Sequence, residues 1–168
     1  MKVGFAKAFD IPGILEIMDY WLNVTSKEKG FLFGVPFSEM ELQRLIDNYA
    51  VVIAKKDNTV QGYFIVDEVT NNETTQMNKD LLDEVYSKEV FGYEKEDLIP
   101  RGSIAVSPKC QEMVSPDLIA FFKDNYQGIK NALFSIVSTE NPNIDIHLQN
   151  GFEMVLEDER YYYVIFRL

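Results

Sequence analysis

Apolar residues along the chain follow two patterns, one typical of amphipathic helices and one typical of buried strands. Apolar residues three and four positions apart predict helices that begin near Asp10, Ser38 and Ser115. Short and nearly continuous apolar runs, such as 50–54 and 133–137, predict strands that are covered on both faces. Because the two kinds of segment alternate, the sequence predicts an α/β fold.

The predicted strands are short apolar runs bounded by turn residues, and they span 3–9, 50–54, 60–69, 103–106, 133–137, 152–156 and 161–168. Asp57 and Asn58 form a two-residue turn that makes the second and third strands an antiparallel hairpin. The helix that begins at Ser115 connects the fourth strand to the fifth, so these two strands become parallel neighbours through a crossover. We expect a mixed sheet with helices on both faces.

The best-marked helix start lies at Ser115. Ser115 favours the N-cap, Pro116 suits the first helical position, and Asp117 is stabilised at the positive end of the helix dipole. A strand leads through a short loop into this helix, and backbone amides in such a place can face an anion. A phosphate-bearing cofactor, if one binds, is therefore expected here.

The segment 70–98 is longer than a hairpin connection. It contains a polar loop, a helix with an apolar face that includes Leu82 and Val85, and a charged run over 94–97. The carboxylates of this run either attract a cationic acceptor or form a solvated face. Charge runs are more often solvated faces, so the second interpretation is favoured.

The composition fits one domain over 1–168. A chain of 168 residues with 46% hydrophobic content can form one core, and no linker-like stretch divides it. Sixteen basic and 27 acidic residues give a formal charge of −11. This charge disfavours binding to nucleic acid or to anionic membranes, and it is compatible with an amine or other cationic partner.

Cysteine usage and the lengths of the apolar runs bear on the compartment. Cys110 is the only cysteine, so the chain has neither an internal disulfide nor the cysteine spacing of a zinc site. The apolar run near the N-terminus is short and contains Lys7, unlike a signal peptide. No run approaches the roughly 20 apolar residues that cross a bilayer. We expect a soluble, cytoplasmic protein without a bound metal.

In the stretch 101–117, Val106 ends the fourth strand, Pro108 follows two residues later, and Gln111 precedes the helix that begins at Ser115. This stretch resembles the acetyl-CoA-dependent N-acetyltransferases of the GNAT superfamily. In that family a valine ends the fourth strand, a proline follows two residues later, and Gln/Arg-x-x-Gly-x-Gly/Ala leads into a helix. Val106, Pro108 and Gln111 are in register with this pattern. The two glycine positions hold Val114 and Pro116, so the loop that holds the pyrophosphate of CoA in the family is altered here.

The other elements are similar to those of the family in their order. Asn141, Gly151 and Phe152 match marks of its last helix and strands, and His147 stands where the family often has a tyrosine as general acid. The resemblance implies a single GNAT-like domain over 1–168. Its sheet is expected to be mostly antiparallel, with six to seven strands and a parallel central pair.

The resemblance also implies an acetyl-CoA site between the fourth and fifth strands. The residues expected to bind acetyl-CoA lie on the fourth strand, in the loop after it and before the last helix: Ile104, Ala105, Val106, Lys109, Gln111, Glu112, Met113, Val114, Ser115 and Asn141. His147 is the expected proton donor to the CoA sulfur, and Asp67 and Glu68 are the expected base. Phe31 and Phe33 either line the acceptor pocket, as the loop between the first two helices does in the family, or fill the edge of the core. Without the resemblance, His147 would be an ordinary hydrogen-bonded helix residue, and that alternative stays open.

The activity that the resemblance implies is transfer of an acetyl group from acetyl-CoA to a primary amine of a small molecule or peptide. One alternative is a GNAT-fold protein that has lost the cofactor and serves as a binding or interaction module. Another is an unrelated α/β domain, which a different strand order would reveal. Residues 161–166 either form the edge of a homodimer or lie within the sheet of the monomer.

Overall fold

The computed structural model describes residues 1–24, 36–66, 79–126 and 128–168. Its strands are β1 (Lys2–Phe5), β2 (Val51–Lys56), β3 (Thr59–Val66), β4 (Leu98–Val106), β5 (Ala132–Ser138), β6 (Glu153–Glu157) and β7 (Tyr161–Arg167). Its α-helices are α1 (Ile11–Val24), α2 (Glu39–Asp47), α3 (Lys79–Ser87), α4 (Ser115–Tyr126) and α5 (Ile144–Gln149). Two short 3-10 helices, Ala8–Asp10 and Lys95–Asp97, precede α1 and β4.

The strands form one seven-stranded sheet in the order β1-β2-β3-β4-β5-β7-β6. The pair β4 and β5 is parallel, and the other neighbours are antiparallel. This arrangement confirms the predicted mixed sheet with a parallel central pair. It also settles the position of residues 161–166, because β7 lies between β5 and β6 and is internal to the monomer. Of the described strands, β1 and β6 form the two edges.

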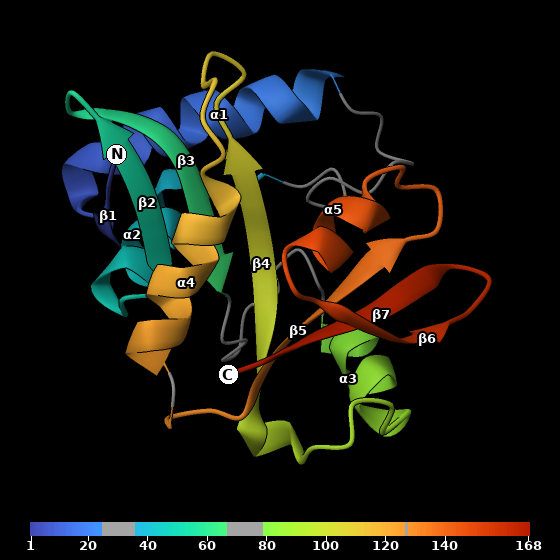
Figure 1. Ribbon diagram of the computed structural model, residues 1–168. Coiled ribbons are helices and arrows are strands. Elements are labelled where there is room, and N and C mark those ends of the chain that lie inside the picture. The colour runs from blue at the N-terminus through green and yellow to red at the C-terminus, as the bar shows by residue number, and fades with distance from the viewer. Residues whose placement is uncertain (25–35, 67–78, 127) are drawn as a thin grey trace.

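The sheet divides at its centre, because β4 and β5 are paired over only three residues each. Leu98 to Pro100 of β4 pair with Ala132 to Phe134 of β5. Beyond that point β4 follows β3, while β5 follows β7. A register shift between β3 and β4 leaves Gly102 unmatched, and such bulges bend a strand. The upper halves of β4 and β5 therefore diverge, as Figure 1 shows.

Helices cover both faces of the sheet. In Figure 1 α4 crosses in front of the sheet, and α1 and α2 lie behind it. The ring of Phe122 on α4 meets that of Phe64 on β3 edge-on at 5.2 Å, and both side chains are fully buried. On α1, Ile14 and Met18 are also fully buried. The main core thus lies between the helices and the first half of the sheet.

The helix α3 covers the other half of the sheet and forms a second core. Its buried residues Leu82 and Val85 belong to one cluster with Phe134 of β5 and with Tyr163 and Ile165 of β7. A predicted helix in the long 70–98 segment is therefore present. It buries apolar surface that β5 and β7 would otherwise expose.

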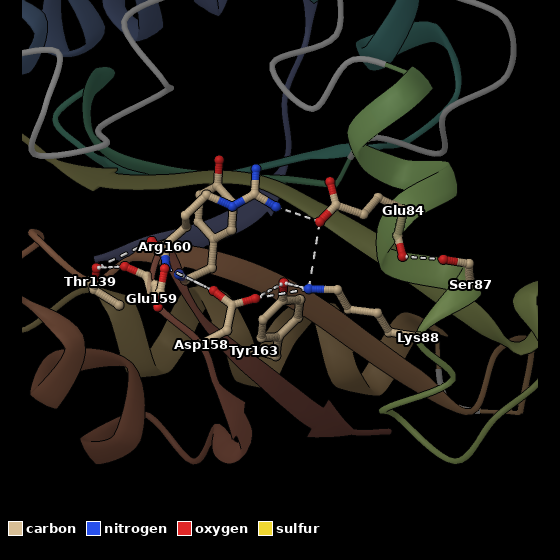
Figure 2. Close-up of polar contacts among 9 residues, drawn as sticks. Glu84, Ser87, Lys88, Thr139, Asp158, Glu159, Arg160 and Tyr163 are labelled. Carbon is tan, nitrogen blue, oxygen red and sulfur yellow. Dashed lines mark hydrogen bonds and ion pairs between the residues drawn. The ribbon is translucent and has the colours of Figure 1, made fainter.

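A polar network ties the end of α3 to the turn between β6 and β7 (Figure 2). Lys88 Nζ lies 2.8 Å from Asp158 Oδ2 and 2.6 Å from the Tyr163 hydroxyl, which itself donates to Asp158 at 2.7 Å. Arg160 forms an ion pair with Glu84 of α3. The hydrogen bond from Lys88, and next the one from Tyr163, hold the pKa of the Asp158 carboxyl well below its usual range.

Several local predictions agree with the structure. Ser38 caps α2, with Glu41 N donating to Ser38 Oγ at 3.3 Å and Ser38 N donating to Glu41 Oε2 at 2.7 Å. Asp57 and Asn58 adopt φ values of 50° and 63°, as a tight turn between β2 and β3 requires. No helix in the described ranges is long and apolar enough to cross a membrane.

Two boundaries differ by several residues from the sequence-based expectations. The first strand ends at Phe5, because the Asp10 carboxylate accepts a hydrogen bond from Lys7 N at 3.0 Å and folds 8–10 into a helical turn. Asp10 also pairs with Lys55 at 2.9 Å, so it fixes this turn to β2 and is no simple helix cap. The fourth strand begins at Leu98, five residues before the predicted start, since Arg101 and Gly102 interrupt the apolar pattern but stay in the strand.

Candidate functional site

A cavity of about 250 Å³ occupies the space between the diverging halves of β4 and β5. Its lining comes from β4, β5, the helices α4 and α5, the residues on either side of α5, and one residue of α1. The lining residues are Trp21, Arg101 to Val106, Ser115, Ile119, Ser135 to Val137, Asn141, Asn143, Ile146, His147, Asn150 and Phe152. The division of the sheet therefore creates the cavity.

The backbone of β4 offers hydrogen-bonding groups to this cavity. Ser107 N donates to Gln61 O of β3 at 2.8 Å, and Gln61 is next to Gly62, the partner of Val106. In an antiparallel ladder the outward groups alternate, so the N–H and C=O of Ile104 and Val106 point away from β3 and toward the gap. Trp21 Nε1 donates to one of these groups, Val106 O, at 2.8 Å. An extended ligand could pair with the others.

Arg101 lies at the narrow end of the cavity, one residue beyond the last β4–β5 pair. Its Nη2 is 3.0 Å from Ser135 Oγ and 2.8 Å from His147 Nε2. The guanidinium carbon lies 5.4 Å from the centre of the Phe152 ring. Burial lowers the pKa of Arg101 to about 10, so the side chain remains a cation at neutral pH.

Both ring nitrogens of His147 are engaged. Its Nδ1 lies 3.0 Å from Asn143 O, one turn earlier in the chain, and its Nε2 faces Arg101. A backbone carbonyl only accepts and a guanidinium only donates, so Nδ1 carries the proton and Nε2 accepts. Burial, and next the charge of Arg101, lower the pKa of His147 to about 3. His147 is thus a neutral, hydrogen-bonded helix residue that also lines the cavity.

Polar atoms without partners gather beside this cavity. Within the described residues, the buried side-chain atoms that lack a hydrogen bond are Tyr63 OH, Arg101 Nε and Ser103 Oγ. Arg101 and Ser103 both belong to the lining. Burial raises the pKa of the Tyr63 hydroxyl, and the neighbouring Ser103 side chain opposes that rise. Unpaired buried polar groups are rare in folded proteins, and a ligand is one physical explanation for them.

The cavity brings together part of the predicted site. Of the residues expected to bind acetyl-CoA, Ile104, Ala105, Val106, Ser115 and Asn141 line it. The expected base, Asp67 and Glu68, and the expected acceptor contacts, Phe31 and Phe33, lie outside the described residues.

The other predicted cofactor residues, which belong to the loop between β4 and α4, do not line the cavity. Lys109 pairs with Glu16 at 3.0 Å, and Glu112 pairs with Lys56 at 2.7 Å. Met113 is 85% exposed. Gln111, also exposed, is outside the lining as well.

Val114 occupies the place of a family glycine, and its side chain belongs to the core. It is 1% exposed, and its Cγ1 lies 3.3 Å from the point where a Cβ on Gly62 would be. Its carbonyl accepts the hydrogen bond from Leu118 N at 3.1 Å that opens α4. The residue therefore packs the start of α4 against β3. The sequence resemblance did not indicate this packing role.

Some residues of the site were not predicted from the sequence. Trp21 belongs to an apolar stripe that predicts only a core position, yet it lines the cavity and bonds β4. Arg101 and Ser135 sit inside strands, and their partnership depends on the β4–β5 register. A charged residue within an otherwise apolar strand is the signal that could have pointed to Arg101. The described residues contain no group of His, Cys, Asp or Glu that could hold a metal.

Solved structures of other proteins share this architecture. No protein-family model matches the sequence, and no curated protein matches it either. Solved structures do match over 99–100% of the chain. The yncA protein of Salmonella typhimurium, solved with its cofactor acetyl-CoA, matches with a TM-score of 0.68, 13% identity and 94% of its own length covered. A GNAT-family acetyltransferase of Listeria monocytogenes matches with a TM-score of 0.68, 16% identity and 94% coverage. The chain has the GNAT fold.

N-acetylglutamate synthase of Neisseria gonorrhoeae, solved with coenzyme A and N-acetyl-glutamate, matches this GNAT fold with a TM-score of 0.66 and 18% identity. The chain spans about a third of that enzyme, 35% of its length. These matches over nearly the whole chain exclude the alternative of an α/β domain with a different fold. At these identities the likeness establishes the fold.

Proposed function

We propose that the chain transfers an acetyl group from acetyl-CoA to a primary amine of a small molecule or peptide. The observation that carries the proposal is the cavity between the diverging strands, where backbone groups of β4 have no partner strand in the part of the chain that the structure describes. Proteins of the same fold have been solved with acetyl-CoA or coenzyme A, which supports this ligand. An amine acceptor is compatible with the formal charge of −11.

The lining fits the chemistry of the proposed cosubstrate. The outward N–H and C=O groups of Ile104 and the N–H of Val106 would hold the amide-containing arm of CoA, and Ile136 and Val137 would pack on its apolar parts. Ser115 and Asn141 would contact polar groups. Acetyl-CoA, when bound, supplies an acetyl group activated as a thioester.

Acetyl transfer needs a group that takes a proton from the amine and a group that protonates the departing sulfur. Asp67 and Glu68 remain the proposed base. The neutral state of His147 leaves it without a proton at Nε2, so we assign it the orientation of Arg101 in place of proton donation. The departing sulfur then receives the proton that the base has taken from the amine, directly or through water. Arg101 is then the cation that faces the narrow end of the cavity.

A binding module without catalysis is the second candidate, and the loop before α4 favours it. Val114 is committed to the core, and Lys109 and Glu112 are paired with Glu16 and Lys56. None of these side chains lines the cavity. A diphosphate would therefore be held by backbone amides near Ser115 alone, and we expect the affinity for CoA to be lower than with a loop that also offers side chains.

The test is titration with acetyl-CoA, read by calorimetry and by the fluorescence of Trp21. Trp21 is the only tryptophan and lines the cavity, so its emission reports directly on ligand entry. Dephospho-coenzyme A and pantetheine are the comparison ligands, and Trp21→Phe shows that the optical signal comes from this residue. Micromolar binding with a change in emission supports the acetyltransferase, whereas no binding at millimolar acetyl-CoA favours the non-catalytic module.

The proposed location is the cytoplasm, where the free thiol of Cys110 stays reduced.

A further inference from the structure

We propose that Arg101 binds a carboxylate group at the narrow end of the cavity. This inference rests on the proposed function, because acyl transfer supplies the two candidate ligands, the amine acceptor and the acyl group. The carboxylate belongs either to the amine acceptor, as in an amino acid, or to the acyl group that is transferred. The substrate that carries the carboxylate is then either an acceptor that resembles an amino acid or a dicarboxylic acyl group.

Among the described residues, none supplies a counter-ion for the charge of Arg101. Its nearest polar contacts, Ser135 and His147, are both neutral, and Phe152 offers only a ring face. No acidic residue is among the described residues that line the cavity. A charge that is taken out of water without a partner destabilises a fold. A bound anion would offset that cost.

Arg101 also has hydrogen-bond donors to spare. A guanidinium carries five N–H donors, and Ser135 and His147 engage only the two on Nη2. Nε has no partner among the described residues. The planar fork of an arginine matches the two oxygens of a carboxylate, which can accept two parallel hydrogen bonds. Ser135 and His147 fix the orientation of this fork from one side.

The position of Arg101 separates it from the phosphate end of a CoA molecule. Arg101 directly follows Pro100, the last residue of β4 that pairs with β5. Val106, next to the loop that leads to α4, lies five residues further along the strand, which is about 17 Å at roughly 3.3 Å per residue. A diphosphate near Ser115 would therefore not reach Arg101. The anion at Arg101 must come from the acyl group or from the acceptor.

His147 offers a direct readout of this site. It is the only histidine, so its ring proton signals need no assignment, and its Nε2 lies 2.8 Å from Arg101 Nη2. The charge of Arg101 lowers the pKa of His147. A carboxylate bound to Arg101 would offset that charge, so we expect the pKa of His147 to rise and its ring signals to shift.

The experiment titrates the full chain with matched ligands while the His147 ring is followed by NMR. Alanine and ethylamine differ by one carboxylate, and they test the acceptor as its source. Succinyl-CoA and propionyl-CoA differ by one carboxylate on the acyl group, and they test the other source. In at least one of the two pairs, we expect the ligand with the carboxylate to shift the His147 signals more than its partner does. If neither alanine nor succinyl-CoA shifts them more than its partner does, the proposal is overturned.

Variants link the effect to Arg101. Arg101→Met is expected to weaken binding of the carboxylate ligand at least tenfold, and Arg101→Lys is expected to fall between it and the unaltered chain, since it keeps the charge without the fork. Arg167→Met, a substitution of an exposed arginine on β7 outside the cavity, is the matched control and should bind normally.

Thermal unfolding separates a ligand site from a structural role. We expect the melting temperature of Arg101→Met to be no lower than that of the unaltered chain, because an unpaired charge is removed. A clear drop in melting temperature, with carboxylate binding unchanged in Arg101→Lys, would instead assign Arg101 to the scaffold. Acetyl-CoA binding is measured separately through Trp21. A chain that binds acetyl-CoA without any response to a carboxylate refutes this inference and leaves the proposed function standing.

A chain that responds to alanine but does not bind acetyl-CoA refutes the proposed function and leaves the carboxylate site standing.

Discussion

At the scale of single residues, the pair of Arg101 and His147 decides how the cavity can work. An arginine that donates to a histidine keeps the imidazole neutral, and burial acts in the same direction. The two side chains come from β4 and α5, and they meet because β4 and β5 diverge just beyond Pro100. Within the described ranges, the lining of the cavity therefore carries one positive charge and a neutral imidazole.

The ring of His147 should not titrate between pH 5 and pH 8. Its pKa of about 3, against an ordinary value of 6.5, keeps the ring neutral over this range. The measurement is a proton NMR titration of the single histidine in the chain without ligand. In Arg101→Met the pKa should rise, because the guanidinium charge is gone, while burial still holds it below 6.5. A titration midpoint near 6.5 in the unaltered chain would return His147 to the role of a proton donor.

The sequence could locate His147 but not its chemistry. Its place in the helix before Gly151 indicates a position near the site, whereas its protonation depends on Arg101, which is 46 residues away in the chain. A contact of this kind follows from the β4–β5 register and cannot be inferred from spacing. For the same reason Trp21 is predicted as core, although it reaches across to the carbonyl of Val106.

At the scale of elements, local signals predicted where most helices and turns begin. The capping pair Ser38 and Glu41 and the turn at Asp57 and Asn58 act within a few residues, so the sequence alone carries them. The start of α4 was also predicted near Ser115. What could not be predicted was the orientation of Val114, because its burial depends on Gly62 of a distant strand.

Replacing Val114 with glycine restores the family pattern, but we expect it to destabilise the fold. The substitution removes a side chain that is 1% exposed and that packs between α4 and β3. Loss of a buried valine costs about 2 to 4 kcal/mol in the free energy of unfolding. Urea denaturation measures this cost, and Met113→Gly, at a neighbouring position that is 85% exposed, is the control. A Val114→Gly chain as stable as the control would show that Val114 is not a core anchor.

The polar network between α3 and the β6–β7 turn makes a measurable contribution to stability. Lys88→Met removes the contacts of 2.8 Å to Asp158 and 2.6 Å to Tyr163. We expect a loss of about 1 kcal/mol, because both charged side chains are 28% exposed and partly screened by solvent. Lys109→Met removes an ion pair whose partners are 81% and 72% exposed, and it should leave the free energy of unfolding unchanged. Equal effects of the two substitutions in chemical denaturation would mean that the network in Figure 2 carries no special weight.

At the scale of the whole molecule, the order of the elements was enough to predict the sheet. Alternating apolar segments, one tight turn and one helical crossover indicate a mixed sheet with a parallel pair, and the structure confirms it. The length of the parallel pairing was not predictable, because it depends on a bulge at Gly102 and on the side chains that fill the gap. The cavity exists only because that pairing stops after three residues. The cavity, on which the proposed function depends, is thus the feature of the fold that local sequence patterns specify least.

The stability of the whole chain should fall as the pH is lowered from 6.5. The unfolded chain protonates His147 with an ordinary pKa of 6.5, whereas the folded chain resists protonation down to about 3. Between these values the unfolded state binds more protons, so the free energy of unfolding decreases by up to about 1.4 kcal/mol per pH unit, or about 2 kcal/mol at pH 5. Above pH 6.5 this contribution is fully present and constant.

His147→Gln isolates that effect from the carboxylates, because an amide can still accept from Arg101 and donate to Asn143 without titrating. Asp158, whose pKa is held below its usual range, loses its contribution only at lower pH. Urea unfolding of both chains at pH 7, 6 and 5 should therefore give curves that separate below pH 6.5, with the unaltered chain losing more. If the two chains decline together, His147 is not held neutral by the fold, and the cavity does not impose the charge arrangement on which a carboxylate site at Arg101 depends.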